Sequence, residues 1–118
     1  MTLFQNPGQG VQTEDMDLSV LRYGARDAGL ATHEVDLARV RDERTLLNEL
    51  GNSLGLPGGI GWDALGDALA SAGTGRVLVL TGWPSFRSDH ADLAARVEAL
   101  VREAQASGAS KLYAFGVH

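Results

Sequence analysis

Two aspartates stand one helical turn apart in the segment WDALGDAL, residues 62–69. If this segment is helical, Asp63 and Asp67 lie on the same side, where like charges repel by roughly 0.2–0.5 kcal/mol. Two such carboxylates could act as a general acid and a general base, as in glycoside hydrolysis. They could equally attract a cationic partner through charge-assisted hydrogen bonds. The rest of the sequence indicates which chemistry is favoured.

An enzyme active site finds little support in the surrounding residues. Two side chains on one short exposed helix do not define a cleft, and no serine–histidine or histidine–carboxylate group lies nearby in the sequence. The string GGIGWDA matches the G-x-G-x-x-A pattern of dinucleotide-binding loops. A helix, not a strand, is expected before it, and Asp63 would repel a phosphate. A small hydrolytic or nucleotide-binding enzyme is therefore the weaker alternative.

Other potential ligands also have simpler explanations. Asp89, His90 and Asp92 could suggest a metal site, but acidic residues at a helix start also complement the helix dipole. On its expected strand, His33 should be packed or hydrogen-bonded and not catalytic. The chain contains no cysteine, which excludes disulfides, thiolate metal sites and cysteine nucleophiles. We expect no metal, no cofactor and no catalytic residue.

The distribution of charge points to a basic partner. The formal net charge is −5, which disfavours direct binding of nucleic acid, because phosphates are bound by clusters of lysine and arginine. No Lys, Arg or His lies between Arg44 and Arg76, whereas Glu49, Asp63 and Asp67 do. An ordinary solvated acidic face is the simplest interpretation, and a surface for a cationic protein is the more specific one.

The opening residues, MTLFQNPGQG, have no basic region and no apolar run long enough for a signal peptide, and nothing later resembles a membrane span. We therefore expect a soluble cytoplasmic protein with no membrane partner. A length of 118 residues suits one domain with an ordinary apolar core.

Hydrophobic periodicity and turn residues predict the elements that position the aspartates. Asp42 is the expected N-cap of the second helix, and this helix should end before Pro57. Ser88 or Asp89 is the expected N-cap of the last helix, and Gly108 should end it. In chain order the prediction is a loose arm over about ten residues, a helix over 15–28, a strand over 31–37, helices over 42–56 and 62–70, a strand over 76–83, a long helix and a final strand over 111–117.

The apolar faces of these elements predict the core. The strand at 76–83 is apolar on both faces, as in a parallel sheet, and helical crossovers between strands are right-handed by default. The fold class is therefore α/β, a small three-stranded parallel sheet flanked by helices, with an N-terminal helical extension. Both Trp62 and Trp83 are expected in the core. The helical stripes are Leu18, Leu21 and Ala25; Leu46, Leu47, Leu50 and Leu54; Ala64, Leu65, Ala68 and Leu69; and Leu93, Ala94, Val97, Leu100, Val101 and Ala104.

The order of elements and motifs along the chain resembles that of the barstar-like ribonuclease inhibitors. The order is a strand, an LLxxLxxxLxLP helix, a glycine turn, WDALxDxL, a VLVL strand, a helix with VREAxxxG and a final strand. The resemblance covers residues 31–118 as the inhibitor domain and leaves residues 1–30 as an arm and a short helix packed on it. It implies a bacterial toxin-immunity protein that plugs the active site of a small, basic, guanyl-specific-type ribonuclease in a one-to-one complex.

The resemblance also implies which residues bind the ribonuclease. Asp63 and Asp67 match the two family aspartates on the inhibitory helix, and Asp67 is expected to reach the catalytic cleft. Glu103 matches an acidic contact on the long helix, whereas Ser107 stands where some members have a second glutamate. A cleft that holds a phosphodiester must be cationic, so carboxylates can take the place of phosphates.

The loop before the inhibitory helix departs from the family pattern. Its residues, Gly58 to Gly61, are about two fewer than usual and lack the paired aromatics and asparagine that members often carry. Ile60, Gly61 and Trp62 are expected to supply part of that contact, and Gly66 stands at a position that is bulky in some relatives. These changes bear on which enzyme is the target. They also leave open a nearer alternative, an immunity or adaptor domain of the same fold that binds a different protein.

Overall fold

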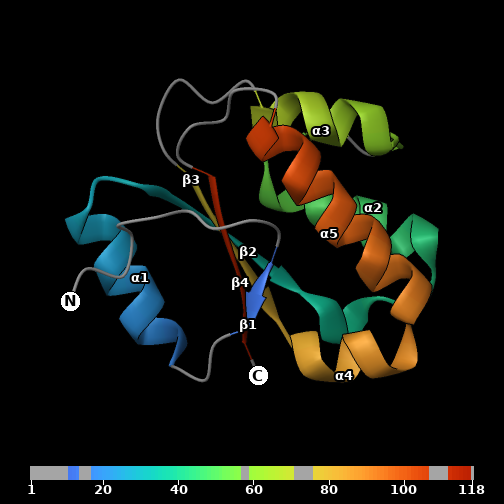
Figure 1. Ribbon diagram of the computed structural model, residues 1–118, viewed down its shortest axis with the longest axis horizontal. Coiled ribbons are helices and arrows are strands. Elements are labelled where there is room, and N and C mark those ends of the chain that lie inside the picture. The colour runs from blue at the N-terminus through green and yellow to red at the C-terminus, as the bar shows by residue number, and fades with distance from the viewer. Residues whose placement is uncertain (1–10, 14–16, 57–58, 71–75, 107–111, 118) are drawn as a thin grey trace.

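A parallel β-sheet lies at the centre of the computed structural model, with α1 on one face and α2, α3, α4 and α5 on the other (Figure 1). The structure describes residues 11–13, 17–56, 59–70, 76–106 and 112–117. Its elements are β1 (Gln12–Thr13), α1 (Leu18–Asp27), β2 (Ala31–Asp36), a 3-10 helix η1 (Leu37–Arg39), α2 (Glu43–Ser53), α3 (Trp62–Ala70), β3 (Arg76–Thr81), α4 (Trp83–Asp89), α5 (Ala91–Ala106) and β4 (Leu112–Val117).

The three long strands confirm the predicted three-stranded parallel sheet. The strand order is β1-β4-β3-β2, and Val35 of β2 pairs with Leu80 of β3, which pairs with Gly116 of β4. Since β3 lies between two strands and under helices on both faces, its four middle residues are buried, which explains its lack of polar alternation. The sequence did not predict β1, a two-residue strand that extends the sheet beside β4.

Helix α1 covers one face of the sheet. Its buried residues Leu21 and Ala25 pack on side chains of β3 and β4, among them Val77 and Phe115. An ion pair between Arg22 and Glu34, with N–O distances of 2.5 and 2.6 Å, ties the helix to β2. The predicted helix is thus present, and its predicted first residues lie partly outside the described part of the chain. The division of the chain near residue 30 stays a prediction.

Helix α2 begins where the sequence predicted. The Asp42 carboxylate accepts the backbone N–H of Thr45 at 2.9 Å, and the Thr45 hydroxyl accepts the backbone N–H of Asp42 at 3.0 Å. This reciprocal capping box satisfies amide groups that the helix itself leaves free. Of the predicted stripe, Leu46 and Leu50 are buried. The cap and the stripe together fix where the chain enters the loop that leads to α3.

The region between β3 and α5 differs from the prediction. Ser88 and Asp89 do not cap the long helix, because they form the end of a separate helix, α4, and α5 begins at Ala91. The start of α4 is set by Gly82, whose φ of 76° is in the left-handed region that favours glycine, and by a proline in the first turn. Trp83, the first residue of α4, is fully buried, as predicted.

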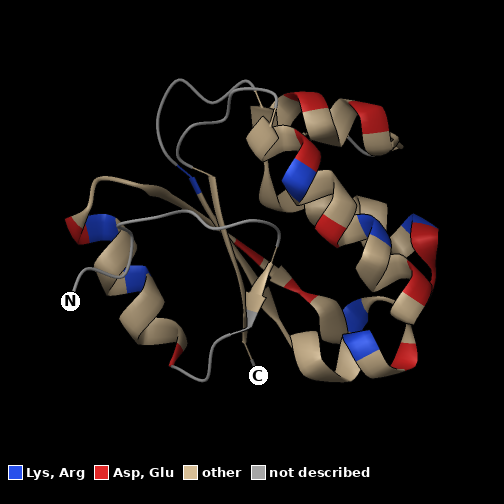
Figure 2. Ribbon diagram, in the orientation of Figure 1, with Lys and Arg blue, Asp and Glu red and all other residues tan. Residues whose placement is uncertain are grey.

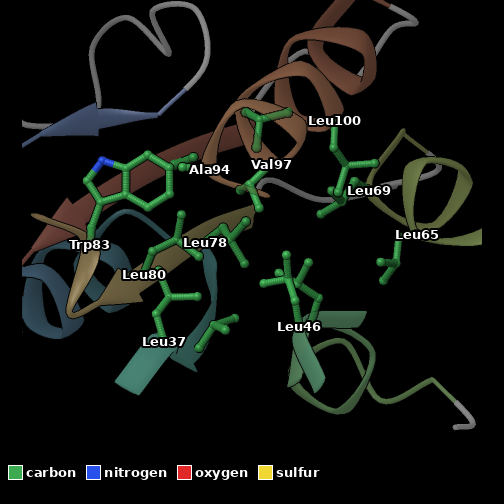
Figure 3. Packing of buried hydrophobic residues seen from close by; sticks show 14 of the residues in the cluster. Leu37, Leu46, Leu65, Leu69, Leu78, Leu80, Trp83, Ala94, Val97 and Leu100 are labelled. Carbon is green, nitrogen blue, oxygen red and sulfur yellow. The ribbon is translucent and has the colours of Figure 1, made fainter. Parts of the chain in front are cut away.

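The main core fills the space between the sheet and the four helices on its other face (Figure 3). Leu78 and Leu80 of β3 face Trp83, Leu37 and the stripe of α5, whose predicted residues are buried except for the half-buried Leu93. Leu65 and Leu69 anchor α3 to this core. Among the described residues, no helix is long and apolar enough to cross a membrane.

Candidate functional site

Helix α3 has the predicted bounds and turns its two aspartates to solvent. Leu65 and Leu69 are buried, whereas Asp63 and Asp67 are exposed on the other side of the helix. The predicted inward face is narrower than expected, since Ala64 is exposed. Asp63 lies in the first turn, where a negative charge complements the helix dipole. Figure 2 shows acidic residues along α3 and no basic residue.

An open groove of about 600 Å³ lies between α3 and α5. Five of the seven predicted contact residues line it: Trp62, Asp63, Gly66 and Asp67 from α3 and Glu103 from α5. Residues far apart in the sequence are therefore brought to one surface. The remaining lining residues are Ala70, Arg96, Ala99, Leu100 and Ala104.

The two helices run in the same direction along this groove. The Arg96 guanidinium carbon lies 4.9 Å from the centre of the Trp62 ring. One turn further on each helix, a Cβ placed on Gly66 would lie 3.5 Å from Leu100 Cδ1. Because Gly66 has no side chain and alanines line both walls, the floor between the charged residues is apolar and unobstructed.

The carboxylates of the groove are not neutralised within the described part of the chain. The ion pairs found there join Arg22 to Glu34 and Arg39 to Asp36, away from the groove. Asp63, Asp67 and Glu103 are all exposed. Three carboxylates from two helices thus face a shared surface where a cationic partner could pair with them.

Trp62 connects three helices at one end of the groove. Its indole Nε1–H donates a hydrogen bond to the Glu43 carboxylate of α2 at 2.7 Å, and its ring stacks under Arg96 of α5. Its side chain is half-buried, so it is less enclosed than the predicted core position. Sequence reasoning missed both Glu43 and Arg96, because their contacts depend on how the helices pack.

Ile60 and Gly61 lie outside the α3–α5 groove. Ile60 is half-buried against the main core and lines a second depression of about 770 Å³, beside Glu43 and Leu47 of α2. Gly61 is exposed directly before α3. The structure therefore separates Ile60 from the aspartates. Two other residues considered from the sequence, Gly58 and Ser107, lie outside the described residues.

The alternative ligands have structural roles. His33 Nδ1 lies 2.8 Å from the Ser53 carbonyl oxygen, which agrees with the predicted hydrogen-bonded histidine. The His90 ring packs on Phe86, with centroids 5.4 Å apart, and Asp92 lies in the first turn of α5. In the ranges that the structure describes, no group of three His, Cys, Asp or Glu residues could hold a metal ion.

Comparison with known proteins gives a family match and matches among solved structures. The family model described as barstar (barnase inhibitor) matches residues 30–117. No curated protein matches the chain. A chain in the structure of Drosophila ORC bound to DNA superposes with a TM-score of 0.64 at 13% sequence identity, over 99% of this chain and 33% of that chain. The present chain thus spans one third of that protein chain, and the likeness is one of fold alone.

Proposed function

The chain belongs to the barstar family, and we propose that it inhibits a small basic ribonuclease by covering the enzyme's active site with α3 and α5. The observation that carries this proposal is the shared groove. Asp63, Asp67 and Glu103 lie along it, exposed and without an ion-pair partner among the described residues. Family membership supports an inhibitor with no reaction of its own, no cofactor and no direct contact with nucleic acid.

Electrostatics explains how such a groove would block a ribonuclease. The enzyme must hold a phosphodiester, so its cleft presents arginine, lysine or protonated histidine. Carboxylates at the phosphate positions would form short charge-assisted hydrogen bonds with these groups. The repulsion between Asp63 and Asp67 in the free protein would be relieved on binding. Opposite surface charges would also speed the diffusional encounter.

The proposed complex contains one molecule of each protein and acts in the cytoplasm of the bacterium that makes the ribonuclease, as an immunity protein. A specific interface of this kind buries on the order of 1,600 Å². The α3–α5 groove would form its centre. The depression beside Ile60 would lie at its edge, because Trp62 and Glu43 link the two regions.

The variant Asp67→Ala tests this proposal. Loss of one partner of a buried charge pair typically costs about 2–5 kcal/mol in protein complexes, or roughly 30-fold to a few thousand-fold in affinity, and the founding complex of this family is itself a measured example that includes larger losses. We expect Asp67→Ala to lose affinity for the ribonuclease in this range, mainly through faster dissociation. Thermal stability should stay near that of the wild type, because Asp67 is exposed.

Asp27→Ala is the matched control. Asp27 is also exposed, ends α1 on the opposite side of the sheet, and its loss changes the net charge equally. Binding kinetics would be measured by surface plasmon resonance with both variants. Equal affinities for Asp67→Ala and Asp27→Ala would remove the support that the groove gives to ribonuclease inhibition.

A second candidate function is an immunity or adaptor domain that binds a different protein. The residues before α3 favour it, since Gly59, Ile60 and Gly61 present no aromatic side chain. Identification of the protein that copurifies with the chain from its native cells separates the two candidates. A nuclease supports inhibition, and a partner without nuclease activity supports the adaptor.

A further inference from the structure

Arg96 is a cation in a groove otherwise charged by carboxylates. Its side chain is exposed and stacks over Trp62, with the guanidinium carbon 4.9 Å from the ring centre. No ion pair joins it to Asp63, Asp67 or Glu103 in the described part of the chain. For attracting a positively charged partner, this residue is electrostatically unfavourable.

The stacking holds Arg96 in place and leaves its donors available. A cation over an indole ring is held by the ring's quadrupole and not by a hydrogen-bond acceptor, and a guanidinium has five N–H donors, so donors remain for a partner. The indole is itself fixed by the 2.7 Å hydrogen bond from Trp62 Nε1 to Glu43. Less side-chain entropy is therefore lost when Arg96 binds an acceptor on a partner.

The position of Arg96 gives the groove two different ends. At the Trp62 end Arg96 adds a positive charge beside Asp63, whereas further along the charged lining residues are carboxylates alone, Asp67 on α3 and, about two turns after Arg96, Glu103 on α5. A cleft lined only by cations would place a like charge against Arg96, which is unfavourable and selects against that partner. A cleft that also contains a carboxylate would satisfy both ends of the groove.

We propose that Arg96 is a specificity-determining residue that selects a ribonuclease with an acidic side chain at the border of its cationic cleft. The proposal rests on the proposed ribonuclease inhibition. Such a carboxylate is compatible with the enzyme's chemistry, because removal of a proton from the ribose hydroxyl requires a general base and Glu and Asp are among the side chains that serve. Arg96 would donate to that carboxylate while Asp67 and Glu103 pair with cations.

The test compares the binding kinetics of Arg96→Ala with those of Arg102→Ala. Arg102 is exposed on the same helix and does not line the groove, so its loss changes the net charge equally. Both variants should associate slightly faster with a basic enzyme, by less than about threefold. Only Arg96→Ala should dissociate faster, by about 10- to 100-fold, because it alone loses a charged hydrogen bond.

Two further measurements separate recognition from a structural effect. Arg96→Lys keeps the charge but loses the planar donor pair, so its dissociation rate should fall between those of wild type and Arg96→Ala. Each acidic residue bordering the ribonuclease cleft would also be changed to its amide. In one of these enzymes Arg96→Ala should no longer weaken binding, whereas a loss caused by altered folding would persist in all of them.

The outcomes distinguish this inference from the proposed function. If the wild type inhibits a ribonuclease and Arg96→Ala behaves like Arg102→Ala or binds more tightly, the role of Arg96 is overturned and inhibition stands. If no amide variant of the enzyme abolishes the effect, the acidic partner is overturned. If the wild type binds no ribonuclease, the proposed function fails and this inference fails with it.

Discussion

Gly116 of β4 provides the space that Trp83 occupies, and this contact can be tested by adding one methyl group. A Cβ on Gly116 would lie 2.9 Å from Trp83 Cβ and closer still to Cγ and Cδ1 of the ring. Trp83 is fully buried at the start of α4 and contacts Phe86, with ring centroids 6.0 Å apart. Since the overlapping atoms are at the base of the side chain, relief requires a shift of α4 or β4.

The size of the effect follows from this geometry. Overpacking of a core costs typically about 1–3 kcal/mol, and a clash that no rotamer change relieves belongs in the upper half of that range. We therefore expect Gly116→Ala to lower the free energy of unfolding by about 2–3 kcal/mol and the melting temperature by roughly 10 °C. Urea denaturation followed by circular dichroism measures the loss.

Gly66→Ala is the control, because it adds the same methyl group where there is room. Its Cβ would make an ordinary contact with Leu100 at 3.5 Å, and alanine within a helix is favoured over glycine by about 0.5–1 kcal/mol. It should be neutral or stabilising. In a Trp83→Ala background, which removes Cγ and Cδ1 and leaves only the 2.9 Å approach to Cβ, Gly116→Ala should lose most of its effect. A change of less than about 0.5 kcal/mol from Gly116→Ala in the wild type would refute this packing.

Two further predictions concern pH and salt. Hydrogen bonds from the Thr45 backbone N–H and hydroxyl lower the pKa of Asp42, so its stabilisation is complete above the ordinary aspartate pKa of about 3.9 and is lost as the pH falls through the lower folded value. The variant Asp42→Asn still caps the helix but does not titrate. In urea denaturation over about pH 2–7, it should therefore lose less stability on acidification than the wild type. Equal losses of stability in the two proteins would contradict this prediction. Association with the ribonuclease should slow as salt rises, because the Debye length falls from about 10 Å at 0.1 M to 3 Å at 1 M. A stopped-flow rate that does not change with salt would mean that the acidic surface plays no part in the encounter.

Much of the fold could be predicted because local pattern and tertiary packing agree. The spacing of Leu65 and Leu69, with Gly61 before them, predicted a helix with the bounds that α3 has in the structure. Asp42 correctly predicted the start of α2. The apolar run of β3 indicated a strand covered on both faces. In each case the residues that set the local conformation also face the core.

Other features were not predictable because they depend on contacts between distant segments. β1 is two residues long and carries no pattern, and α4 begins at a left-handed Gly82 that a sequence does not reveal. The same holds in the candidate site. The acidic residues were found from their spacing and from family resemblance, whereas Arg96 meets Trp62 only because α5 packs beside α3. The sequence likewise did not predict that Ile60 lies apart from the aspartates, because this depends on how the loop before α3 packs against α2.

The most direct measurement titrates the purified protein into a fixed concentration of each of several small, basic, guanyl-specific ribonucleases while RNA cleavage is followed. Ribonuclease inhibition through the α3–α5 groove predicts that, for at least one enzyme, activity falls in proportion to added protein and reaches zero at equal molarity. Undiminished cleavage by every enzyme at a large molar excess of the protein would contradict it.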